Sequence, residues 1–149
     1  MKSVFAKSVL IAAALFAAAS PSLAQSAASA TAPAESRVVY HVSEVASLRD
    51  ALNNIINHMS TSPNSRITLL ANANGVFGLV KGERDRQGDY QSTISSLQSK
   101  GVTFVACNLS MKKRNIDPGT LLSNVRTVES GVVELTRLQT QDHHAYIKP

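Results

Sequence analysis

Strand-like runs and amphipathic stretches alternate through the middle of the chain, and this alternation constrains the fold more than any other feature. Residues 37–42, 66–71 and 102–106 are short runs rich in Val, Ile and Leu, as expected of buried strands. Between them, apolar side chains recur at helical spacing over residues 48–59 and 90–97. This strand and helix order predicts βαβ units and a parallel sheet.

The C-terminal third continues the pattern with shorter elements. We expect a helical turn over 109–114, a short helix opened by Asp117-Pro118, a strand over 126–128, a helix capped by Ser130 and a last strand over 145–148. Residues 81–89, charged and bracketed by glycines, are predicted to be a solvated loop. The fold class is therefore α/β, with a parallel sheet of about five strands in a domain over residues 37–149.

The N-terminus has the features of a secretory signal peptide. Lys2 and Lys7 flank an apolar run over residues 8–19, and Ser22-Leu23-Ala24 has the small-x-small pattern of a cleavage site. Residues 1–24 are therefore expected to be removed, although an uncleaved anchor is the alternative. Residues 25–36 are rich in Ala and Ser and predict a flexible lead-in. We expect a periplasmic protein without a membrane segment after cleavage.

Composition and missing motifs exclude several functions. Removing both leader lysines lowers the net charge from +5 to +3, so the mature chain is only mildly basic. With 5% aromatic residues, the chain also has few side chains on which nucleic-acid bases could stack. The chain has no Gly-rich phosphate loop, no Gly-x-Ser-x-Gly elbow and no Cys-x-x-Cys pair. His143 and His144 are adjacent and would point to opposite faces of a strand, so we expect no metal site there. No cofactor and no nucleic-acid partner are expected.

Cys107 is the only cysteine, so it cannot form a disulfide within one chain. In an oxidising compartment it can be buried and inert, paired between chains, or kept for chemistry. It lies where a strand meets a helical turn, so backbone N–H groups can point at its sulfur, and Lys112, Lys113 and Arg114 add positive potential. These influences favour thiolate over thiol.

In a parallel sheet, the carboxyl ends of the strands meet at one edge, where ligands bind. In the flavodoxin-like strand order 2-1-3-4-5, strands one and three are neighbours, and these end in His41 and Cys107. We therefore expect Cys107 as an exposed nucleophile at the mouth of a cleft, with His41 and Asn108 assisting it. A purely structural role for His41 is the alternative. The candidate substrate-binding residues are Asn72, Asn74, Gly75 and Lys112.

Several segments together resemble the DsrE/DsrF-like family of sulfur metabolism. They are Val38–Val42, Ala51–Ile55 with Asn57-His58, Gly101–Asn108, Ser130–Leu135 with Leu138-Gln139, and Ala145–Pro149. The resemblance implies a three-layer αβα domain that assembles as a homotrimer or homohexamer. In sulfur-relay members, a cysteine after the third strand carries sulfur as a persulfide, and Cys107 occupies that position.

The resemblance and the candidate site give one leading hypothesis and one rival. The leading hypothesis is a periplasmic sulfur carrier or sulfurtransferase-like protein that uses Cys107 as a persulfide-forming nucleophile, with a sulfur donor or acceptor protein as a possible partner. Export distinguishes this chain from the cytoplasmic relay members, which makes transfer-RNA thiolation an implausible role. The alternative is a non-catalytic homo-oligomeric module of the same fold that binds a small ligand.

Overall fold

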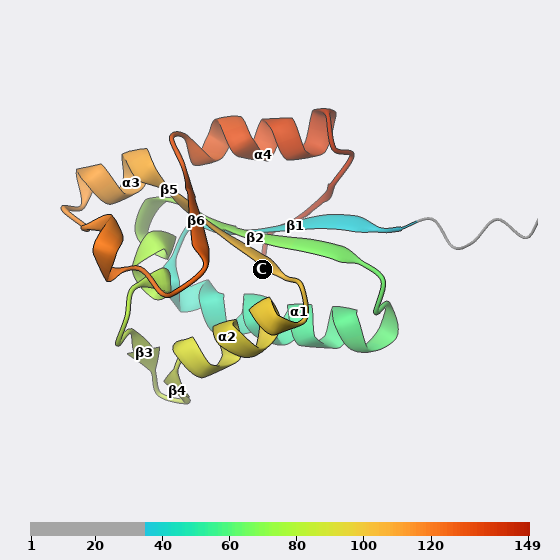
Figure 1. Cartoon of the computed structure of the whole chain (residues 1–149), viewed down its shortest axis with the longest axis horizontal. Coiled ribbons are helices and arrows are strands. Elements are labelled where there is room, and N and C mark those ends of the chain that lie inside the picture. The colour runs from blue at the N-terminus through green and yellow to red at the C-terminus, as the bar shows by residue number, and fades with distance from the viewer. Residues whose placement is uncertain (1–34) are drawn as a thin grey trace, which may run out of the picture. The chain divides into compact units, whose positions relative to one another are not determined.

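A computed structural model describes residues 35–149, which form one α/β unit around a five-stranded parallel sheet (Figure 1). The predicted signal peptide and most of the predicted lead-in lie outside the described residues. The strands of the sheet are β1 (Arg37–Val42), β2 (Arg66–Ala71), β5 (Thr103–Cys107), β6 (Val125–Val128) and β7 (Ala145–Ile147). The α-helices are α1 (Leu48–Thr61), α2 (Gln91–Ser99), α3 (Asn108–Lys113) and α4 (Gly131–Thr140).

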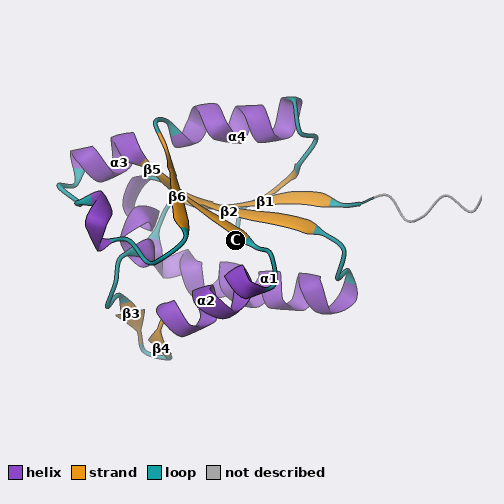
Figure 2. Ribbon diagram, in the orientation of Figure 1, coloured by secondary structure: helices purple, strands orange, loops and turns teal. Residues whose placement is uncertain are grey.

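Helices cover both faces of the sheet, so the molecule has three layers (Figure 2). On one face α1 and α2 pack on alternate strand residues such as Tyr40, Leu69 and Phe104. On the other face α4 covers the residues between them, including Leu70 and Val105. Strands buried on both faces carry near-continuous apolar runs, which is why they were readable from the sequence. The predicted α/β class and three-layer architecture are confirmed.

The order of the strands is β6-β5-β2-β1-β7, which differs from the order used to place the site. The connections through α1 and α2 step in one direction across the sheet, so β2 lies between β1 and β5. Only α4 crosses back over the opposite face, and it brings β7 beside β1. The expectation that the strands ending in His41 and Cys107 are neighbours is therefore wrong, although both strands end at the same edge.

Shorter elements complete the chain. Three 3-10 helices span Val45–Ser47, Ala73–Leu79 and Pro118–Thr120. The segment predicted as a solvated loop contains a small antiparallel pair, β3 (Arg84–Asp85) and β4 (Gly88–Asp89). It is tied to α1 by the Arg49 guanidinium, whose Nε lies 2.8 Å from Asp85 Oδ2 and whose plane covers the Tyr90 ring. Within residues 35–149, no helix combines the length and apolarity needed to cross a bilayer.

Candidate functional site

Cys107 is the last residue of β5 and directly precedes α3, so it lies at the junction between the strand and the helix. The backbone N–H of Gly131, the first residue of α4, donates a hydrogen bond to Sγ over 3.1 Å. The Ser110 hydroxyl and the backbone amides of Leu109 and Ser110, in the first turn of α3, add interactions that lower the pKa of this thiol. Donors from two helices therefore converge on one atom.

These donors outweigh the effect of burial on the thiol. Burial raises the pKa of Cys107, whereas hydrogen bonds from the Ser110 hydroxyl and from the amides of Gly131, Ser110 and Leu109 lower it. The net pKa lies below the ordinary value for a cysteine. A donor stabilises the charged form of an acceptor, so the site favours a thiolate.

Ser110 is oriented by a second hydrogen bond. Its Oγ accepts the backbone N–H of Ala73 over 2.9 Å, which uses a lone pair and leaves the hydroxyl proton free to point at the sulfur. Ala73 has a φ of 44°, an uncommon value for a residue other than glycine, and this turn after β2 presents the amide to Ser110. The loop after β2 thereby helps to set the donor that faces Cys107.

Gly131 can approach the sulfur because it has no side chain. A Cβ placed there would lie 3.0 Å from the Cβ of Cys107 and 3.2 Å from the Cβ of Asn72. Both distances are tighter than ordinary carbon contacts, so a side chain would push the start of α4 away from Cys107. Glycine at this position therefore permits the N–H to reach Sγ.

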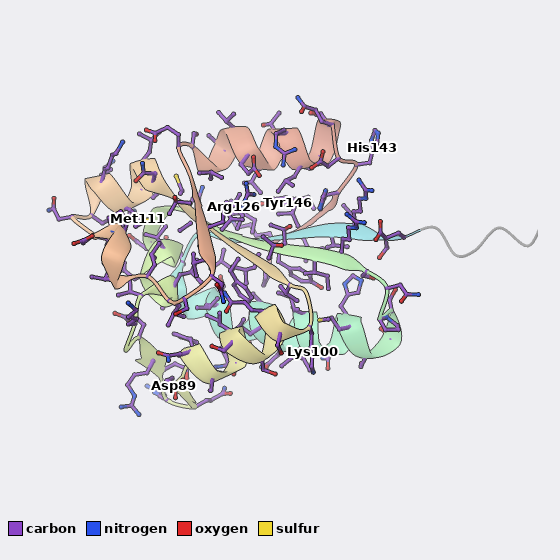
Figure 3. The ribbon with its side chains drawn as sticks, in the orientation of Figure 1. Asp89, Lys100, Met111, Arg126, His143 and Tyr146 are labelled. Atoms are coloured by element: carbon purple, nitrogen blue, oxygen red, sulfur yellow. The ribbon has the colours of Figure 1, made fainter. Side chains whose placement is uncertain are left out.

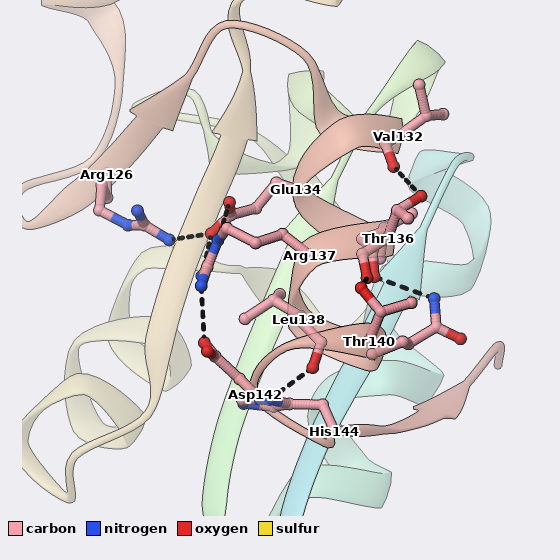
Figure 4. Close-up of polar contacts among 11 residues, drawn as sticks. Arg126, Val132, Glu134, Thr136, Arg137, Leu138, Thr140, Asp142 and His144 are labelled. Atoms are coloured by element: carbon pink, nitrogen blue, oxygen red, sulfur yellow. Dashed lines mark hydrogen bonds and ion pairs between the residues drawn. The ribbon is translucent and has the colours of Figure 1, made fainter.

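A network of ion pairs fixes α4 against the sheet (Figure 4). The buried carboxylate of Glu134 lies 2.7 Å from Arg126 on β6 and 2.9 Å from Arg137, which also reaches Asp142 over 2.8 Å. The Arg137 guanidinium, together with Arg126 and against the effect of burial, lowers the pKa of Glu134 to about 2. The network holds the helix that supplies the Gly131 amide.

His41 lies near the site but not against the sulfur. Its Nδ1 lies 2.7 Å from the Tyr146 hydroxyl and its Nε2 lies 2.9 Å from Asn72 Oδ1. An amide oxygen only accepts, so the network assigns the proton to Nε2 and lets Tyr146 donate to Nδ1. Both ring nitrogens are engaged by Tyr146 and Asn72, so neither of them contacts the Cys107 sulfur.

The other predicted polar residues have different neighbours. Asn108 and Lys112 both bind the carboxylate of Glu129, over 2.9 and 3.1 Å, and not the sulfur. Asn74 bridges Glu44 and Arg114 at the rim of the same edge. A Cβ on Gly75 would collide with the carbonyl of Val42, so close packing against β1 accounts for this glycine.

The expectation of an exposed thiol is wrong, because Cys107 is only 5% exposed. Beside it lies a hollow of about 280 Å³ lined by Asn72, Ala73, Leu109, Ser110, Lys113 and Arg114. Ser110 lines this hollow and lowers the pKa of the neighbouring thiol, so it connects the hollow with Cys107, which does not itself line it. Larger hollows lie at the amino ends of the strands, away from Cys107.

The histidine pair near the C-terminus does not belong to this site. His143 lies beyond the C-terminal end of α4, whereas Met111 on α3 marks the end of the molecule near Cys107 (Figure 3). The Nδ1 of His144 contacts the carbonyl oxygen of Leu138 at 3.2 Å. Among the described residues, no three His, Cys, Asp or Glu side chains gather as a metal site would require.

Sequence reasoning missed Ser110, Gly131 and Tyr146. Ser110 follows Cys107 by three residues, the spacing at which a helical side chain can reach back to the residue before the helix. Gly131 is the first residue of α4, after the N-cap Ser130, and glycine inside a helix is less favourable than alanine, so its presence there was an available signal of close packing. Tyr146 gave no such signal, because its contact with His41 depends on β7 lying beside β1.

Comparisons with known proteins place this geometry in a family. The model of the DsrE/DsrF-like family matches residues 17–149. The structure of MTH1491 from Methanobacterium thermoautotrophicum, a protein of unknown function, is similar with a TM-score of 0.68 and 32% identity over 77% of this chain and 100% of that one. The ychN protein from E. coli shares the fold, with a TM-score of 0.64 and 18% identity over 77% of this chain and 99% of that one. No curated protein matches the sequence. The chain belongs to the DsrE/DsrF-like family.

Proposed function

We propose that this protein is an exported, periplasmic sulfur carrier or sulfurtransferase-like protein in which Cys107 forms a persulfide. Its family is generally related to sulfur relay. The observation that carries the proposal is the hydrogen bond from the Gly131 amide to the Cys107 sulfur over 3.1 Å, to which the Ser110 hydroxyl and the α3 amides add by lowering the pKa of the thiol. Such donors stabilise the anion that must attack, and a cysteine that served only to fill the core would not need them.

The proposed reaction has two displacement steps. The Cys107 thiolate attacks a sulfane sulfur, a new S–S bond forms, the old S–S bond breaks, and the leaving group departs with the electron pair. A thiolate of an acceptor then attacks the outer sulfur of the persulfide and releases the Cys107 thiolate. The Gly131 and Ser110 donors stabilise negative charge on Cys107 before the first step and after the second. His41 acts by holding Asn72 beside Gly131.

Access to the sulfur requires a small movement. Because Ser110 lines the hollow and lies next to Cys107, we expect rotation of its side chain to open a path to the thiol without unfolding α3. The covered thiol is then protected from unselective oxidation in the resting state.

Intact-mass measurement after incubation with inorganic polysulfide tests the proposal. We expect the protein to gain the mass of one sulfur atom, and dithiothreitol to remove it. Because the chain has one cysteine, Cys107→Ser is a complete control and should gain nothing. Wild-type protein that keeps its original mass under conditions that modify a free thiol would overturn the proposal.

The burial of Cys107 favours one second candidate, a homo-oligomeric module that binds a small ligand at the same edge without chemistry. In that case Cys107→Ser retains full function in cells, whereas a carrier loses all transfer. The homotrimer or homohexamer implied by the family resemblance belongs to both candidates, and light scattering tests it. Export is tested by fractionation, where the periplasmic form should begin after residue 24.

A further inference from the structure

We propose that the hollow beside Cys107, here called the basic hollow, admits a small sulfane-sulfur anion, namely thiosulfate or inorganic polysulfide, as the direct donor to Cys107. It is defined by Asn72, Ala73, Leu109, Ser110, Lys113 and Arg114. This inference rests on the proposed function and adds the class of substrate to it. It is carried by the charge of the hollow, its size and its position.

The charge of the hollow is positive. Lys113 and Arg114 line it, and no carboxylate does. Arg114 is held by two neutral acceptors, Asn74 Oδ1 at 2.9 Å and the Ser110 carbonyl oxygen at 3.2 Å, so its position is fixed while its charge is not neutralised. Within the described part of the chain, neither cation joins an ion pair.

The contrast with other basic groups supports this assignment. Lys112, the neighbour of Lys113, pairs with Glu129, and Arg126 and Arg137 share the carboxylate of Glu134. Glu44 binds the nitrogen of the Asn74 amide whose oxygen accepts from Arg114, and it forms no ion pair with Arg114. An anion in the basic hollow would therefore meet two cations without displacing a carboxylate.

The size of the hollow is sufficient for a small ligand. Its volume of about 280 Å³ lies below the roughly 300 to 1,000 Å³ typical of sites for drug-sized ligands. Leu109, which is 51% exposed, forms an apolar lip that suits a polarisable sulfur atom. Thiosulfate and short polysulfides combine a small volume, negative charge and a sulfane sulfur.

The position of the hollow connects it to the nucleophile through Ser110, which lines the hollow and lies three residues after Cys107 at the start of α3. When that side chain rotates, an anion held by Lys113 and Arg114 faces the thiolate. With thiosulfate, the thiolate bonds to the outer sulfur, the bond to the sulfonate sulfur breaks, and sulfite leaves with the electron pair. With polysulfide, a shorter polysulfide leaves. Charge balances in each case, and no oxidant is needed.

Paired alkylation measures the anion preference independently of sulfur chemistry. Iodoacetate is an anion and iodoacetamide is neutral, and both alkylate only Cys107 in this chain. The quantity compared is the alkylation rate with iodoacetate divided by the rate with iodoacetamide. We expect this ratio to be higher for wild-type protein than for a free thiol. In Lys113→Gln/Arg114→Gln the ratio should fall about fivefold to tenfold, because two nearby screened charges are lost. The control Arg86→Gln/Lys100→Gln removes the same charge from exposed positions elsewhere and should leave the ratio unchanged.

Persulfide loading of the same variants separates the two proposals. In Lys113→Gln/Arg114→Gln, persulfide formation should slow by a similar factor with either donor, thiosulfate or polysulfide. Released sulfite reports the reaction with thiosulfate. The donor that loads wild-type protein faster is the preferred source of the sulfane sulfur. If wild type prefers iodoacetate but no donor loads it, the proposed function fails while the basic hollow stands. If an unchanged ratio accompanies normal loading, or if neither reagent reaches Cys107, the basic hollow is refuted.

Discussion

Replacing Glu134 with glutamine tests how firmly α4, and with it the Gly131 amide, is fixed to the sheet. The Glu134 carboxylate is buried, and its arginine partners lower its pKa from 4.5 to about 2, which at full strength corresponds to about 3 kcal/mol of folding free energy. Arg126 and Arg137 are 51% and 37% exposed, so solvent screening reduces this value. We expect Glu134→Gln to lower the free energy of unfolding by about 1 to 2 kcal/mol near neutral pH.

The pH dependence has a definite sign. A carboxyl group whose folded-state pKa is depressed stabilises the fold fully above its unfolded-state pKa, near 4.5, and this contribution is lost as the pH falls toward about 2. Urea denaturation followed by circular dichroism should show a wild-type advantage over Glu134→Gln that is constant from neutral pH down to about 4.5 and nearly absent at about pH 2.

The matched control is Glu129→Gln, since Glu129 also pairs with a basic residue but both partners are more than 60% exposed. Its unfolding curve should overlap that of wild type. Equal destabilisation by the two variants, or a Glu134→Gln difference that persists undiminished at about pH 2, would refute the account of how α4 is held.

Three further substitutions probe the site. Ser110→Ala removes a donor to the thiolate, so the pKa of Cys107 should rise. Because a hydrogen bond to a charged group is worth about 1.5 to 3 kcal/mol, the ratio of thiolate to thiol at a given pH, measured by absorbance at 240 nm, should fall about tenfold or more, and an unchanged ratio would exclude Ser110 as a donor. Gly131→Ala should crowd Cys107, cost about 1 to 3 kcal/mol in urea denaturation and raise the pKa of the thiol; wild-type values for both would show that the contact is loose. Gly75→Ala meets the Val42 carbonyl and should cost more than about 2 kcal/mol while leaving the pKa of Cys107 unchanged in protein that folds, and a stable variant would contradict the packing described.

The elements of the fold were predictable because each is encoded locally. The strand over 66–71 coincides with β2, and the helix read over 48–59 is α1, since the apolar period of each segment is unambiguous. The order of the strands was not predictable, because it depends on which way each crossover turns. Apolar runs alone do not record that direction.

The site was predictable in its centre and not in its surroundings. Cys107 lies at the carboxyl edge of the sheet as expected, because position at the end of a strand is a local property. The amide of Gly131 comes from α4, which crosses back over the sheet, and the pairing of His41 with Tyr146 comes from β7, which follows α4. The order of the strands decides these contacts, and the local sequence does not record that order.

The central claim is that hydrogen-bond donors lower the pKa of the Cys107 thiol despite its burial. The direct measurement is a pH titration of absorbance at 240 nm in wild-type protein, with Cys107→Ser subtracted to remove the tyrosine signal. The account predicts a midpoint below that of a free cysteine, in the direction set by the donors around Sγ. A midpoint at or above the free value would show that burial dominates, and Cys107 would then be a structural thiol.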